Sequence, residues 1–526
     1  MSDLTADGLH TLGRWTRDRA RATPDRVAVD DRGVTLRYRD LDDRAGDLAA
    51  AFRAAGYGIG DRVATITGNS ADQVVLFFAC AQAGLVLVPL SWRLAPRELA
   101  AQLQLADPSL LLVEDEFHTL AAEARGRLDR ALPATLLGMR GVEHLVPPPQ
   151  RGRAEPLVHR AVRDDDALLI VFTSGTLGPA KGVVLTHSNC FWTNLSLSRI
   201  TEITSKDVVL SVMPQYHVGG WNIQPLLAWW MGATVVLERT FDPGRVLHLI
   251  ADRRITTMMG VPANYLFLAQ HPEFAATDLS SLRHAVVGGA PMPAPLLRTW
   301  HARGVALTQG YGLTEASPNV LCLPDEDARS MVGYAGKPYP HVEVAVCDPI
   351  TGALLAGAAT GELLVRGPGV FPGYFRAPDQ TAHTLRDGWL HTGDLVRRDE
   401  HGYFAVIDRL TDIFISGGES IAPAEVETVL VEHTAVDEVA VIGVPHERWG
   451  EVGVAFIVLA PGFSADQAGI LAYARTQLAA FKVPAFVRFV PEIPRSSGSK
   501  VLRRQLLERW QHDLQHHGFQ TIVSDQ

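Results

Sequence analysis

Cysteine is scarce in this sequence, and its four residues lie far apart in the chain. None of them forms a CxxC pair, so the sequence offers neither the usual zinc-site spacing nor a dithiol redox motif. Each has apolar neighbours, which favours buried free thiols and a reducing compartment. The four positions are Cys80, Cys190, Cys322 and Cys347.

Long hydrophobic runs are also missing. The most apolar stretch, Val74–Leu90, contains Gln82, Gly84 and Pro89 and falls short of a membrane-spanning helix. The sequence starts MSDLTADGLH, without the basic and apolar pattern of a secretory signal, and it ends IVSDQ, without a peroxisomal or prenylation signal. We therefore expect a cytoplasmic protein with no membrane span.

An excess of positive charge is absent as well. Lysine and arginine number 48 against 58 aspartates and glutamates, which gives a formal net charge of −10. This balance argues against a general binder of nucleic acids or anionic membranes, so we expect no nucleic-acid partner. The 526 residues, 47% of them hydrophobic, are enough for several globular domains with large cores.

Helical and strand-like segments alternate from about residue 30 to residue 350. Such alternation predicts α/β layers with largely parallel sheets. From about Val342 the strands become shorter and are separated by Gly, Pro and Asp, which predicts a more antiparallel β region. The predicted buried strands of the first part are DRVATI (61–66), GLVLVPL (84–90), SLLLVE (109–114), DVVLSVMP (207–214), GATVVLE (232–238) and LRHAVVGG (282–289).

The last part of the chain has the pattern of a small independent α+β unit. Residues 421–433 predict an amphipathic helix, and residues 438–445 predict a strand. Ser464 with Gln467 predicts the start of another helix. The polar segment DRLTD separates two apolar runs. We therefore predict a large N-terminal domain of layered α/β sheets plus a β-rich subdomain (1–408), a hinge (409–412) and a small α+β C-terminal domain (413–526).

The segment FTSGTLGPAKG, residues 172–182, is unusually rich in glycine and hydroxyl groups. Glycine N–H groups can approach a ligand closely, and with the hydroxyls and the Lys181 ammonium they make an anion site that suits phosphate. A flexible hairpin turn is the simpler alternative. The segment is not a Walker P-loop, because position 180 is Ala and position 182 is Gly, where that motif needs Gly and Ser or Thr.

Five separated motifs occur in an informative order. They are FTSGTLGPAKG, YGLTE at Tyr311–Glu315, HTGD at His391–Asp394, DRLTDIFISGGESIAPAEVE at Asp408–Glu427 and IPRSSGSKVLR at Ile493–Arg503. Together they resemble the adenylate-forming enzymes, which include acyl- and aryl-CoA synthetases, adenylation domains and luciferases. The resemblance covers nearly the whole chain, and the acyl-CoA ligases are the most similar branch.

The resemblance implies a reaction in two halves. A carboxylate attacks the α-phosphorus of MgATP to give an acyl-adenylate and pyrophosphate, and a thiol, usually that of coenzyme A, then displaces AMP. It also implies that the small C-terminal domain is mobile and rotates between the halves. The implied ligands are ATP, Mg²⁺, coenzyme A and a carboxylic acid that is medium- or long-chain, aryl or otherwise bulky and hydrophobic.

The resemblance assigns the nucleotide site residue by residue. Thr314 would contact the α-phosphate, and Glu315 would hold Mg²⁺. Leu177 replaces the usual second threonine of the phosphate loop. The phosphate-binding residues would be Thr173, Ser174, Gly175, Thr176, Gly178 and Lys181, and the adenine and ribose residues would be Gly289, Ala290, Pro291, Gly310, Tyr311, Gly312, Asp394 and Arg409.

It assigns the acyl and thiol sites in the same way. His217 would lie beside the substrate carboxylate, and Lys500 would bridge that carboxylate and the nucleotide during adenylation. For Trp449, simple interdomain packing has similar weight. The acyl pocket would be lined by His217, Gly219, Gly220, Trp221, Gly288, Gly289 and Gly312, and the coenzyme A tunnel by Gly417, Gly418, Glu419 and Trp449. The missing side chains of Gly219 and Gly220 would leave volume for a bulky apolar acyl group.

Two positions depart from the family pattern. Thr411 stands at the hinge where the family usually has Asp or Lys, which bears on the domain rotation and so on the thioester half-reaction. The lysine motif reads GSK at Gly498–Lys500 rather than TGK.

Three alternatives to an acyl-CoA synthetase stay open. They are a ligase that loads the phosphopantetheine of an acyl carrier protein, a luciferase-like oxygenase and a non-catalytic nucleotide-binding protein. The complete set of Lys181, Glu315, Asp394 and Lys500 argues against the last. No aspartate stands near His217 to pair with an α-amino group, which favours a simple carboxylic acid over an amino acid. We expect a monomer or homodimer.

Overall fold

The structure is a computed structural model that describes residues 8–138, 141–142, 160–173, 180–290, 292–416, 419–446, 449–478, 480–496 and 500–523. The chain divides into two compact units. The first comprises Met1–Val344 and Val365–His391, and the second Ala345–Leu364 and Thr392–Gln526. No helix in these described ranges is long and apolar enough to cross a membrane.

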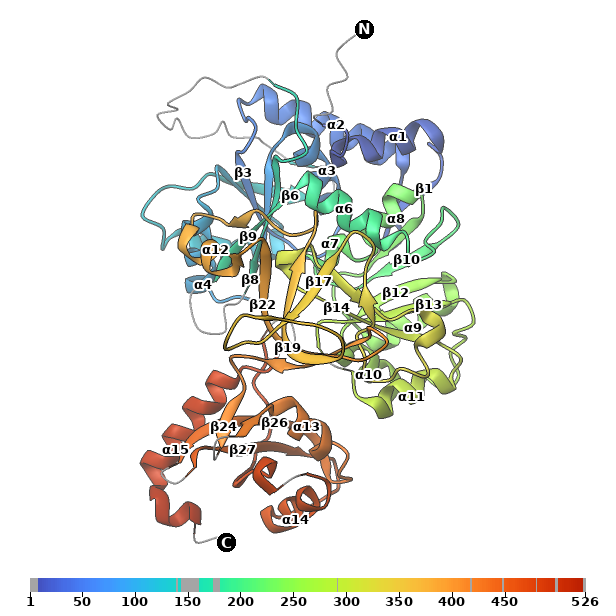
Figure 1. The fold of residues 1–526 in the computed structure, drawn as a ribbon. Helices are drawn as coiled ribbons and strands as arrows, with labels where there is room; N and C mark the ends of the chain where they lie inside the picture. Colours follow the sequence, from blue (N-terminus) through green and yellow to red (C-terminus); the bar gives the residue numbers. More distant parts are fainter. Residues whose placement is uncertain are drawn as a thin grey trace. The chain divides into compact units, whose positions relative to one another are not determined.

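A nine-stranded sheet forms one layer of the first unit (Figure 1), in the order β16-β15-β14-β13-β12-β10-β11-β1-β2. The strands from β14 to β1 pair in parallel, as their near-continuous apolar sequences predict. The strands are β1 (Val27–Asp31), β2 (Val34–Arg37), β10 (Val208–Ser211), β11 (Thr234–Leu237), β12 (Thr257–Gly260), β13 (His284–Val287), β14 (Leu307–Gly312), β15 (Asn319–Cys322) and β16 (Lys337–Pro338).

An eight-stranded sheet forms a second layer, in the order β20-β9-β8-β4-β3-β5-β6-β7. Its centre is parallel, whereas β8 and β9 form an antiparallel pair and β20 joins β9 at the edge. The strands are β3 (Arg62–Ile66), β4 (Val86–Leu90), β5 (Leu110–Val113), β6 (Ala134–Gly138), β7 (Gly141–Val142), β8 (Ala167–Thr173), β9 (Lys181–Thr186) and β20 (Gly373–Tyr374).

Helix α3 (Ala71–Ala83) contacts strands of both sheets, β4 and β1. It is apolar on almost every side, as a helix buried between two layers must be. The Ser70 hydroxyl accepts a hydrogen bond from the Gln73 N–H at 3.2 Å and caps its start, and Gly84 ends it at φ 75°. Val74–Leu90 is therefore a buried helix followed by strand β4.

The other helices of the first unit follow the βα alternation that the sequence predicts. They are α1 (Trp15–Ala22), α2 (Tyr38–Ala54), α4 (Pro96–Ala106), α5 (His118–Arg125), α6 (His187–Leu197), α7 (Gly219–Asn222), α8 (Pro225–Met231), α9 (Pro243–Asp252), α10 (Pro262–Gln270), α11 (Ala294–Ala302) and α12 (Pro378–Thr384). Short 3₁₀ helices cover Leu12–Arg14, Asp115–Phe117, Thr314–Ala316 and Asp325–Asp327.

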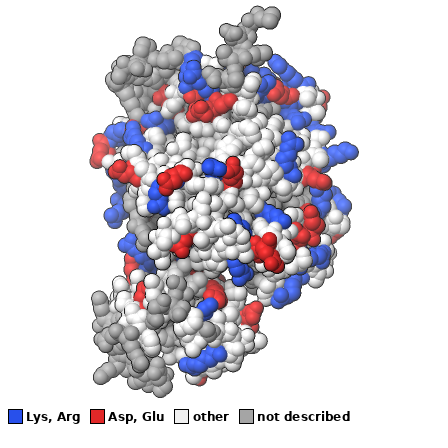
Figure 2. All heavy atoms as spheres, viewed as in Figure 1, with Lys and Arg blue, Asp and Glu red and all other residues white. Residues whose placement is uncertain are grey.

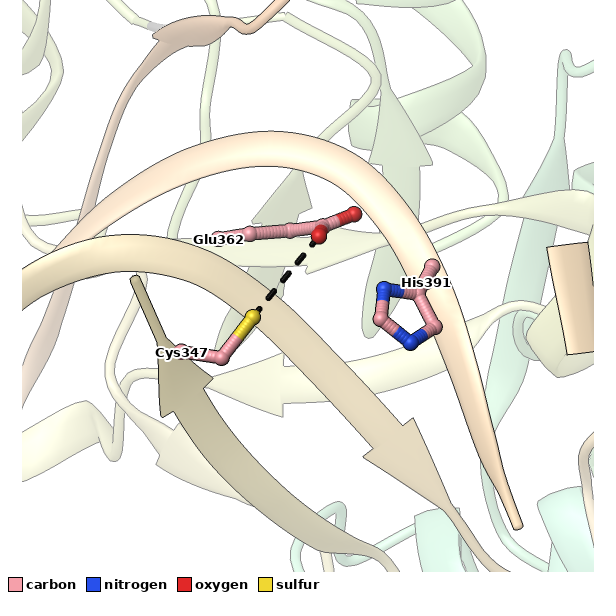
Figure 3. Close-up of side chains that lie close together, drawn as sticks. All are labelled: Cys347, Glu362 and His391. Atoms are coloured by element: carbon pink, nitrogen blue, oxygen red, sulfur yellow. Dashed lines mark hydrogen bonds between the residues drawn. The ribbon is translucent and has the colours of Figure 1, made fainter. Parts of the chain in front are cut away.

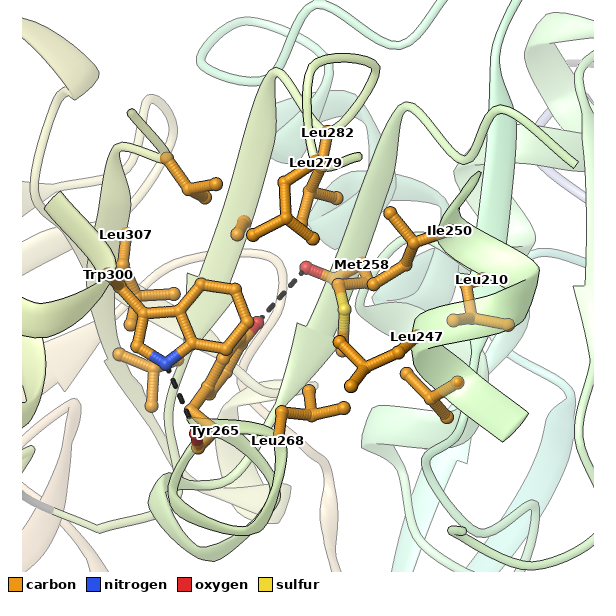
Figure 4. Packing of buried hydrophobic residues seen from close by; sticks show 14 of the residues in the cluster. Leu210, Leu247, Ile250, Met258, Tyr265, Leu268, Leu279, Leu282, Trp300 and Leu307 are labelled. Atoms are coloured by element: carbon orange, nitrogen blue, oxygen red, sulfur yellow. Dashed lines mark hydrogen bonds between the residues drawn. The ribbon is translucent and has the colours of Figure 1, made fainter. Parts of the chain in front are cut away.

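The core beside the nine-stranded sheet contains large aromatic side chains whose polar atoms are all hydrogen-bonded (Figure 4). The Tyr265 hydroxyl donates to the Val286 carbonyl at 2.8 Å, and the Trp300 indole donates to the Tyr265 carbonyl at 3.1 Å. Both side chains are 0% exposed. These bonds offset the free-energy cost of burying a hydroxyl and an indole N–H. The buried apolar surface of both rings therefore stabilises the core without an opposing penalty from unpaired polar atoms.

The chain passes between the two units within three strands, β17 (Glu343–Cys347), β19 (Ala359–Arg366) and β22 (Trp389–Arg398). Within the second unit, β17 pairs with β18 (Leu354–Leu355) and β22 pairs with β23 (Phe404–Arg409), both antiparallel. A short hairpin of the first unit joins β21 (Leu385–Arg386) to the start of β22. This antiparallel style confirms the change predicted after Val342.

The rest of the second unit is a five-stranded sheet buried on both faces (Figure 1). Alternate residues of β26 point to opposite cores: Val441 packs with α13 and α14, whereas Ala440 and Ile442 pack with α15. The elements are β24 (Phe414–Ser416), β25 (Glu419–Ile421), α13 (Pro423–Leu430), β26 (Val436–His446), β27 (Gly450–Leu459), α14 (Gln467–Gln477), a 3₁₀ helix (Ala480–Lys482), β28 (Phe486–Phe489) and α15 (Arg503–Val523).

One predicted helix start is wrong. Asp466, not Ser464, precedes α14, and its Oδ1 accepts a hydrogen bond from the Gly469 N–H at 2.8 Å. Ser464 and Asp466 are both good capping residues, and the sequence rule chose the one with Gln467 three positions later. The fold class is confirmed: a large α/β unit with layered sheets is accompanied by a smaller α+β unit.

His187, the first residue of α6, should make the stability of the protein sensitive to mild acid. Its side chain is buried, and its Nδ1 accepts a hydrogen bond from the Leu12 N–H at 3.1 Å. Burial lowers the pKa of His187 from 6.5 to about 4, against the smaller opposing effect of Asp166 and Asp164. Between these two values the unfolded chain binds a proton that the folded chain excludes, so stability is lost as the pH falls from 6.5 towards 4.

We expect this loss to reach about 3 kcal/mol. The midpoint of thermal unfolding, followed by circular dichroism from pH 8 to pH 4, measures it. The matched variant is His187→Asn, which keeps an acceptor for the Leu12 N–H but has no proton to gain, so its midpoint should fall less steeply. Parallel pH profiles for the two proteins would contradict this role of His187.

Candidate functional site

The parallel strands β10, β12, β13 and β14 bring several of the predicted residues to one edge of the nine-stranded sheet. The segment with His217 follows β10, Gly288 follows β13 directly, and Tyr311 is the next-to-last residue of β14. Loops after neighbouring parallel strands form the crevice in which α/β proteins bind their ligands. The sheet topology therefore explains why residues far apart in the sequence can serve one site.

Three glycines at this edge are explained by the backbone around them. A Cβ on Gly288 would lie 3.3 Å from the Gly310 carbonyl oxygen, so β13 and β14 meet closely there. Gly289 has φ +82°, which glycine adopts without strain. A side chain on Gly312 would overlap the Pro318 backbone. Ala290 follows directly, and Pro291 lies outside the described residues.

Glu315 lies in the 3₁₀ helix Thr314–Ala316, just beyond β14. Its carboxylate Oε1 accepts a hydrogen bond from the Tyr374 hydroxyl at 2.8 Å, and its main-chain carbonyl accepts one from the Phe371 N–H at 2.9 Å. Within the part of the chain that the structure describes, the second carboxylate oxygen, Oε2, accepts no hydrogen bond. A half-buried carboxylate with one oxygen available fits a hard cation such as Mg²⁺, which prefers oxygen ligands and keeps several waters.

Lys181 and Thr173 face each other where β8 and β9 pair, at the two ends of the predicted phosphate loop. The Lys181 ammonium lies 4.9 Å from the centre of the Tyr374 ring. The structure thus brings Lys181 and Glu315 to one tyrosine, although 134 positions separate them in the chain. The other predicted loop residues lie outside the described residues: Ser174, Gly175, Thr176 and Gly178.

The segment after β10 carries the predicted acyl-pocket residues. The His217 N–H donates to the Pro214 carbonyl at 3.0 Å, which forms a tight turn before α7. Trp221 is 0% exposed and stacks on Phe77 at 4.6 Å, and its indole N–H donates to the Gln215 carbonyl at 2.6 Å. Trp221 is therefore a core residue behind this turn.

Gly219 and Gly220 differ in their surroundings. A Cβ on Gly220 would overlap the Pro214 carbonyl, so glycine is needed there for the backbone approach. A Cβ on Gly219 would meet only the Ile223 and Met213 side chains, at 3.5 and 3.7 Å. Of these two glycines, only Gly219 has space for a methyl group. Its missing side chain can therefore enlarge a pocket, whereas that of Gly220 cannot.

Asp394 and Arg409 form an ion pair in the second unit, with the guanidinium Nε 2.9 Å from the carboxylate Oδ1. They face each other across β22 and β23. Asp394 is 3% exposed, so its carboxylate is held in one orientation. This arrangement suits an acceptor for two ribose hydroxyls, with a cation beside it.

Glu362 supports the turn that carries Asp394. Its Oε1 accepts a hydrogen bond from the Gly393 N–H at 3.0 Å, and the Cys347 thiol donates to its Oε2 at 3.7 Å (Figure 3). The Thr392 hydroxyl donates to the Leu363 carbonyl at 2.7 Å. Glu362 was not predicted from the sequence, because an acid inside an apolar strand belongs to no motif. Its position in GELLV was the only sequence signal for it.

Lys500 is exposed in the second unit, and its main chain is hydrogen-bonded to the segment before it. The Ser496 N–H donates to the Lys500 carbonyl at 2.7 Å, and Arg495 and Val501 form an antiparallel bridge. Of the predicted thiol-site residues, Trp449 is 46% exposed in the turn between β26 and β27, and Glu419 begins β25. Gly417 and Gly418 lie outside the described residues.

Arg503 anchors the segment after Lys500. Its guanidinium lies 2.7 Å from Glu427 and 3.3 Å from Asp412, a residue of the predicted hinge. Burial alone would lower the pKa of Arg503, but the carboxylates of Glu427, Asp408 and Asp412 outweigh burial and raise it. Burial raises the pKa of Glu427 against the effect of Arg503. Arg503 has no sequence signal of its own, because it is the last residue of the motif that contains Lys500.

The surface seen in Figure 2 interleaves lysine and arginine with aspartate and glutamate. The described residues include exposed ion pairs, such as Arg366 with Glu343 and Arg254 with Asp278. Exposed pairs of this kind contribute little to stability. On the face shown in Figure 2, positive charge is dispersed among negative charge. In the site described above, individual cations such as Lys181 and Arg409 are held in defined positions instead.

Substituting Gly219 and Gly220 should separate a pocket effect from a folding effect. Gly219→Ala adds a methyl group without a backbone clash, so we expect the activity on a bulky acid to fall more than that on a small acid. Gly220→Ala drives a Cβ into the Pro214 carbonyl, so we expect a lower unfolding temperature and an equal loss for all acids. Turnover on two acids and thermal unfolding measure this. Equal losses for both acids in Gly219→Ala would remove Gly219 from the pocket.

Removing Arg503 should destabilise the second unit. Arg503→Met keeps much of the side-chain volume but leaves the half-buried Glu427 carboxylate without the cation beside it, which costs about 1–3 kcal/mol. Arg504→Met is the matched control, because that neighbour is 70% exposed and its ion-pair partner, Glu508, is 57% exposed. Limited proteolysis followed by mass spectrometry should show earlier cleavage beyond residue 412 in Arg503→Met alone; the same cleavage rate in both variants would contradict the anchoring role.

Comparison with known proteins agrees with this geometry. A family model described as AMP-binding enzyme matches residues 16–375, and one described as AMP-binding enzyme C-terminal domain matches residues 425–500. The feruloyl-CoA synthase of an Amycolatopsis species is 41% identical over 500 residues, which cover 95% of this chain and 99% of that protein. The fatty acid–[acyl-carrier-protein] ligase ScoC of Streptomyces coeruleorubidus is 36% identical over 523 residues, covering 98% of this chain and 99% of that one.

A solved structure has the same fold. The ATP-bound MatB of Rhodopseudomonas palustris superimposes with a TM-score of 0.85 at 32% identity, covering 95% of this chain and 99% of that one. Both family models, the relatives and this fold point to one assignment. The chain belongs to the AMP-binding enzymes, the adenylate-forming family that its five motifs resemble.

Proposed function

We propose that this protein is an AMP-forming acid–CoA ligase. It joins a carboxylate to the α-phosphorus of ATP, with release of pyrophosphate, and then transfers the acyl group to the sulfur of coenzyme A, with release of AMP and the thiol proton. The observation that carries the proposal is the placement of Lys181 and Glu315 about one buried tyrosine, beside Thr314 and the loops of the nine-stranded sheet. The names of the relatives as CoA ligases support the same chemistry.

In the first half-reaction an anion must approach a triphosphate, so the protein's task is to place positive charge and donors. Lys181 and the phosphate loop hold the terminal phosphates, and Thr314 contacts the α-phosphate. Glu315 holds Mg²⁺, which neutralises phosphate charge when bound. Asp394, oriented by Arg409 and Glu362, accepts the ribose hydroxyls.

Tyr311 and the glycines Gly288, Gly289, Gly310 and Gly312 contact the adenine. These glycines carry no side chains that would compete with a purine ring, which would lie against the Tyr311 ring. His217 lies beside the carboxylate of the acid, and Lys500 bridges that carboxylate and the nucleotide. This role requires the second unit to present Lys500, which is exposed next to the bridge between Arg495 and Val501.

For the second half-reaction we assign coenzyme A to the segment Gly417–Glu419 and to the exposed Trp449. The acid is an aryl or bulky hydrophobic one, which agrees with the feruloyl-CoA synthase and indoleacetate–CoA ligase among the relatives. The second candidate acceptor is the phosphopantetheine of a carrier protein, which the name of the ScoC relative favours.

Pyrophosphate release with a panel of acids tests the proposal. Ferulate, indoleacetate, octanoate and malonate sample aryl, medium-chain and small acids, and glycine is the amino-acid control. We expect release with an aryl or medium-chain acid and none with glycine. Adding coenzyme A without a carrier protein should then release AMP; AMP release that needs a carrier protein would instead establish the alternative acceptor. No pyrophosphate with any acid would refute the proposal.

Lys500→Ala should separate the two half-reactions. Loss of the bridging ammonium removes charge stabilisation of the adenylation transition state, so we expect adenylate formation to fall roughly 10²–10³-fold. Transfer from a pre-made acyl-adenylate to coenzyme A should keep most of its rate. Arg504→Ala, an exposed neighbouring cation, is the control and should leave both rates intact. Unchanged adenylation in Lys500→Ala would exclude the bridging role.

A further inference from the structure

Tyr374 holds the two charged residues of the proposed nucleotide site, although no motif pointed to it. Its hydroxyl donates to Glu315 Oε1 at 2.8 Å, and the Lys181 ammonium lies 4.9 Å from its ring centre. The two contacts use different parts of one side chain. The hydroxyl serves the carboxylate, and the negative face of the ring attracts the ammonium.

The position of Tyr374 is fixed on several sides. The two-residue strand β20 places it opposite Val183 of β9, two residues beyond Lys181. Its N–H donates to the Thr381 hydroxyl at 2.9 Å, and its ring meets Phe371 edge to face at 4.9 Å. The side chain is 8% exposed. A ring held in this way cannot follow the charges it contacts, so it sets where they lie.

Lys181 and Glu315 do not pair with each other or with any other charged group that the structure describes. A flexible ammonium near a carboxylate usually forms an ion pair, in which each charge neutralises the other. Here both groups contact one neutral side chain instead: Glu315 binds the Tyr374 hydroxyl, and Lys181 lies over the Tyr374 ring. The ammonium stays available for a phosphate, and the second carboxylate oxygen stays available for a cation. The site therefore holds two opposite charges near one tyrosine without letting them neutralise each other.

We propose that Tyr374 is a positioning residue that keeps Lys181 and Glu315 apart and ready for the metal–nucleotide complex. This inference rests on the proposed function, because it takes Lys181 as a phosphate ligand and Glu315 as a metal ligand. It adds that the tyrosine hydroxyl controls the orientation of Glu315 and hence the metal-dependent part of nucleotide affinity. The ring separately controls the position of the Lys181 ammonium, and hence the part of the nucleotide affinity that does not depend on the metal.

Two substitutions divide the two contacts. Tyr374→Phe keeps the ring and removes only the bond to Glu315, and hydrogen bonds to charged groups contribute enough for about a tenfold change in affinity. We expect this variant to bind the magnesium complex of α,β-methylene-ATP about tenfold more weakly, while its affinity for the same analogue in EDTA stays within about twofold of wild type. Tyr374→Leu removes both contacts and should weaken binding under both conditions.

Isothermal titration calorimetry without any acid or coenzyme A measures these affinities. Tyr339→Phe, which removes a hydroxyl from another buried tyrosine of the same unit, is the matched control and should bind as wild type. Combining Tyr374→Phe with Glu315→Gln should add no further loss of magnesium-dependent affinity, because the hydroxyl acts through that carboxylate. Thermal unfolding of each variant verifies that it is folded.

The inference is overturned if Tyr374→Phe binds the analogue as wild type does in both conditions, or loses affinity equally with and without magnesium. Additive losses in the double variant would overturn it as well. Its failure is distinguishable from failure of the proposed function, which is read from pyrophosphate release by the wild-type enzyme. A wild-type protein that binds no nucleotide would overturn both.

Discussion

The pairing of β20 with β9 is the constraint on which the arrangement of the larger unit's charges depends. Only two residues make this contact, yet it places a side chain from position 374 beside the phosphate-loop lysine and the carboxylate after β14. The loop from β14 to β15 meets the same region, since the Phe371 N–H bonds to the Glu315 carbonyl. Three distant segments are therefore fixed by hydrogen bonds of the main chain before any ligand is considered.

In the second unit, the segment around Lys500 is positioned by a cluster of ion pairs rather than by the pairing of strands. Arg503 pairs with Glu427 of α13 and with Asp412 of the predicted hinge, and it lies three positions after Lys500. Charges that are largely removed from water are costly to bring together and costlier to separate, so this cluster fixes geometry more than it adds stability. The segment that carries the exposed Lys500 therefore cannot shift at Arg503 without separating Arg503 from Glu427 and Asp412.

Much of this organisation could be predicted from the sequence. The apolar runs at 61–66, 84–90 and 207–214 became strands, because parallel strands buried on both faces leave a continuous hydrophobic signal. The five motifs gave the family, and the four cysteines are free and buried as expected. The roles of the individual site residues remain predictions, as do the hinge at 409–412, the monomer or homodimer and the cytoplasmic location.

What the sequence could not supply were contacts between segments that no local pattern connects. Tyr374 sits in a two-residue strand without periodicity, and Glu362 is a lone acid in an apolar strand, so both depend on the tertiary fold for their partners. The same limit applies to Gly219 and Gly220, which are equivalent in the sequence. Only the position of the Pro214 carbonyl distinguishes them.

The burial of all four thiols has a practical consequence for enzymology. Their side chains are at most 6% exposed, and burial raises the pKa of Cys190 to about 12 and that of Cys322 to about 11. Thiolates, not thiols, attack chromogenic disulfide reagents, so the folded protein contributes almost no background colour. Consumption of coenzyme A can therefore be followed continuously by titrating its sulfhydryl in the presence of stoichiometric enzyme.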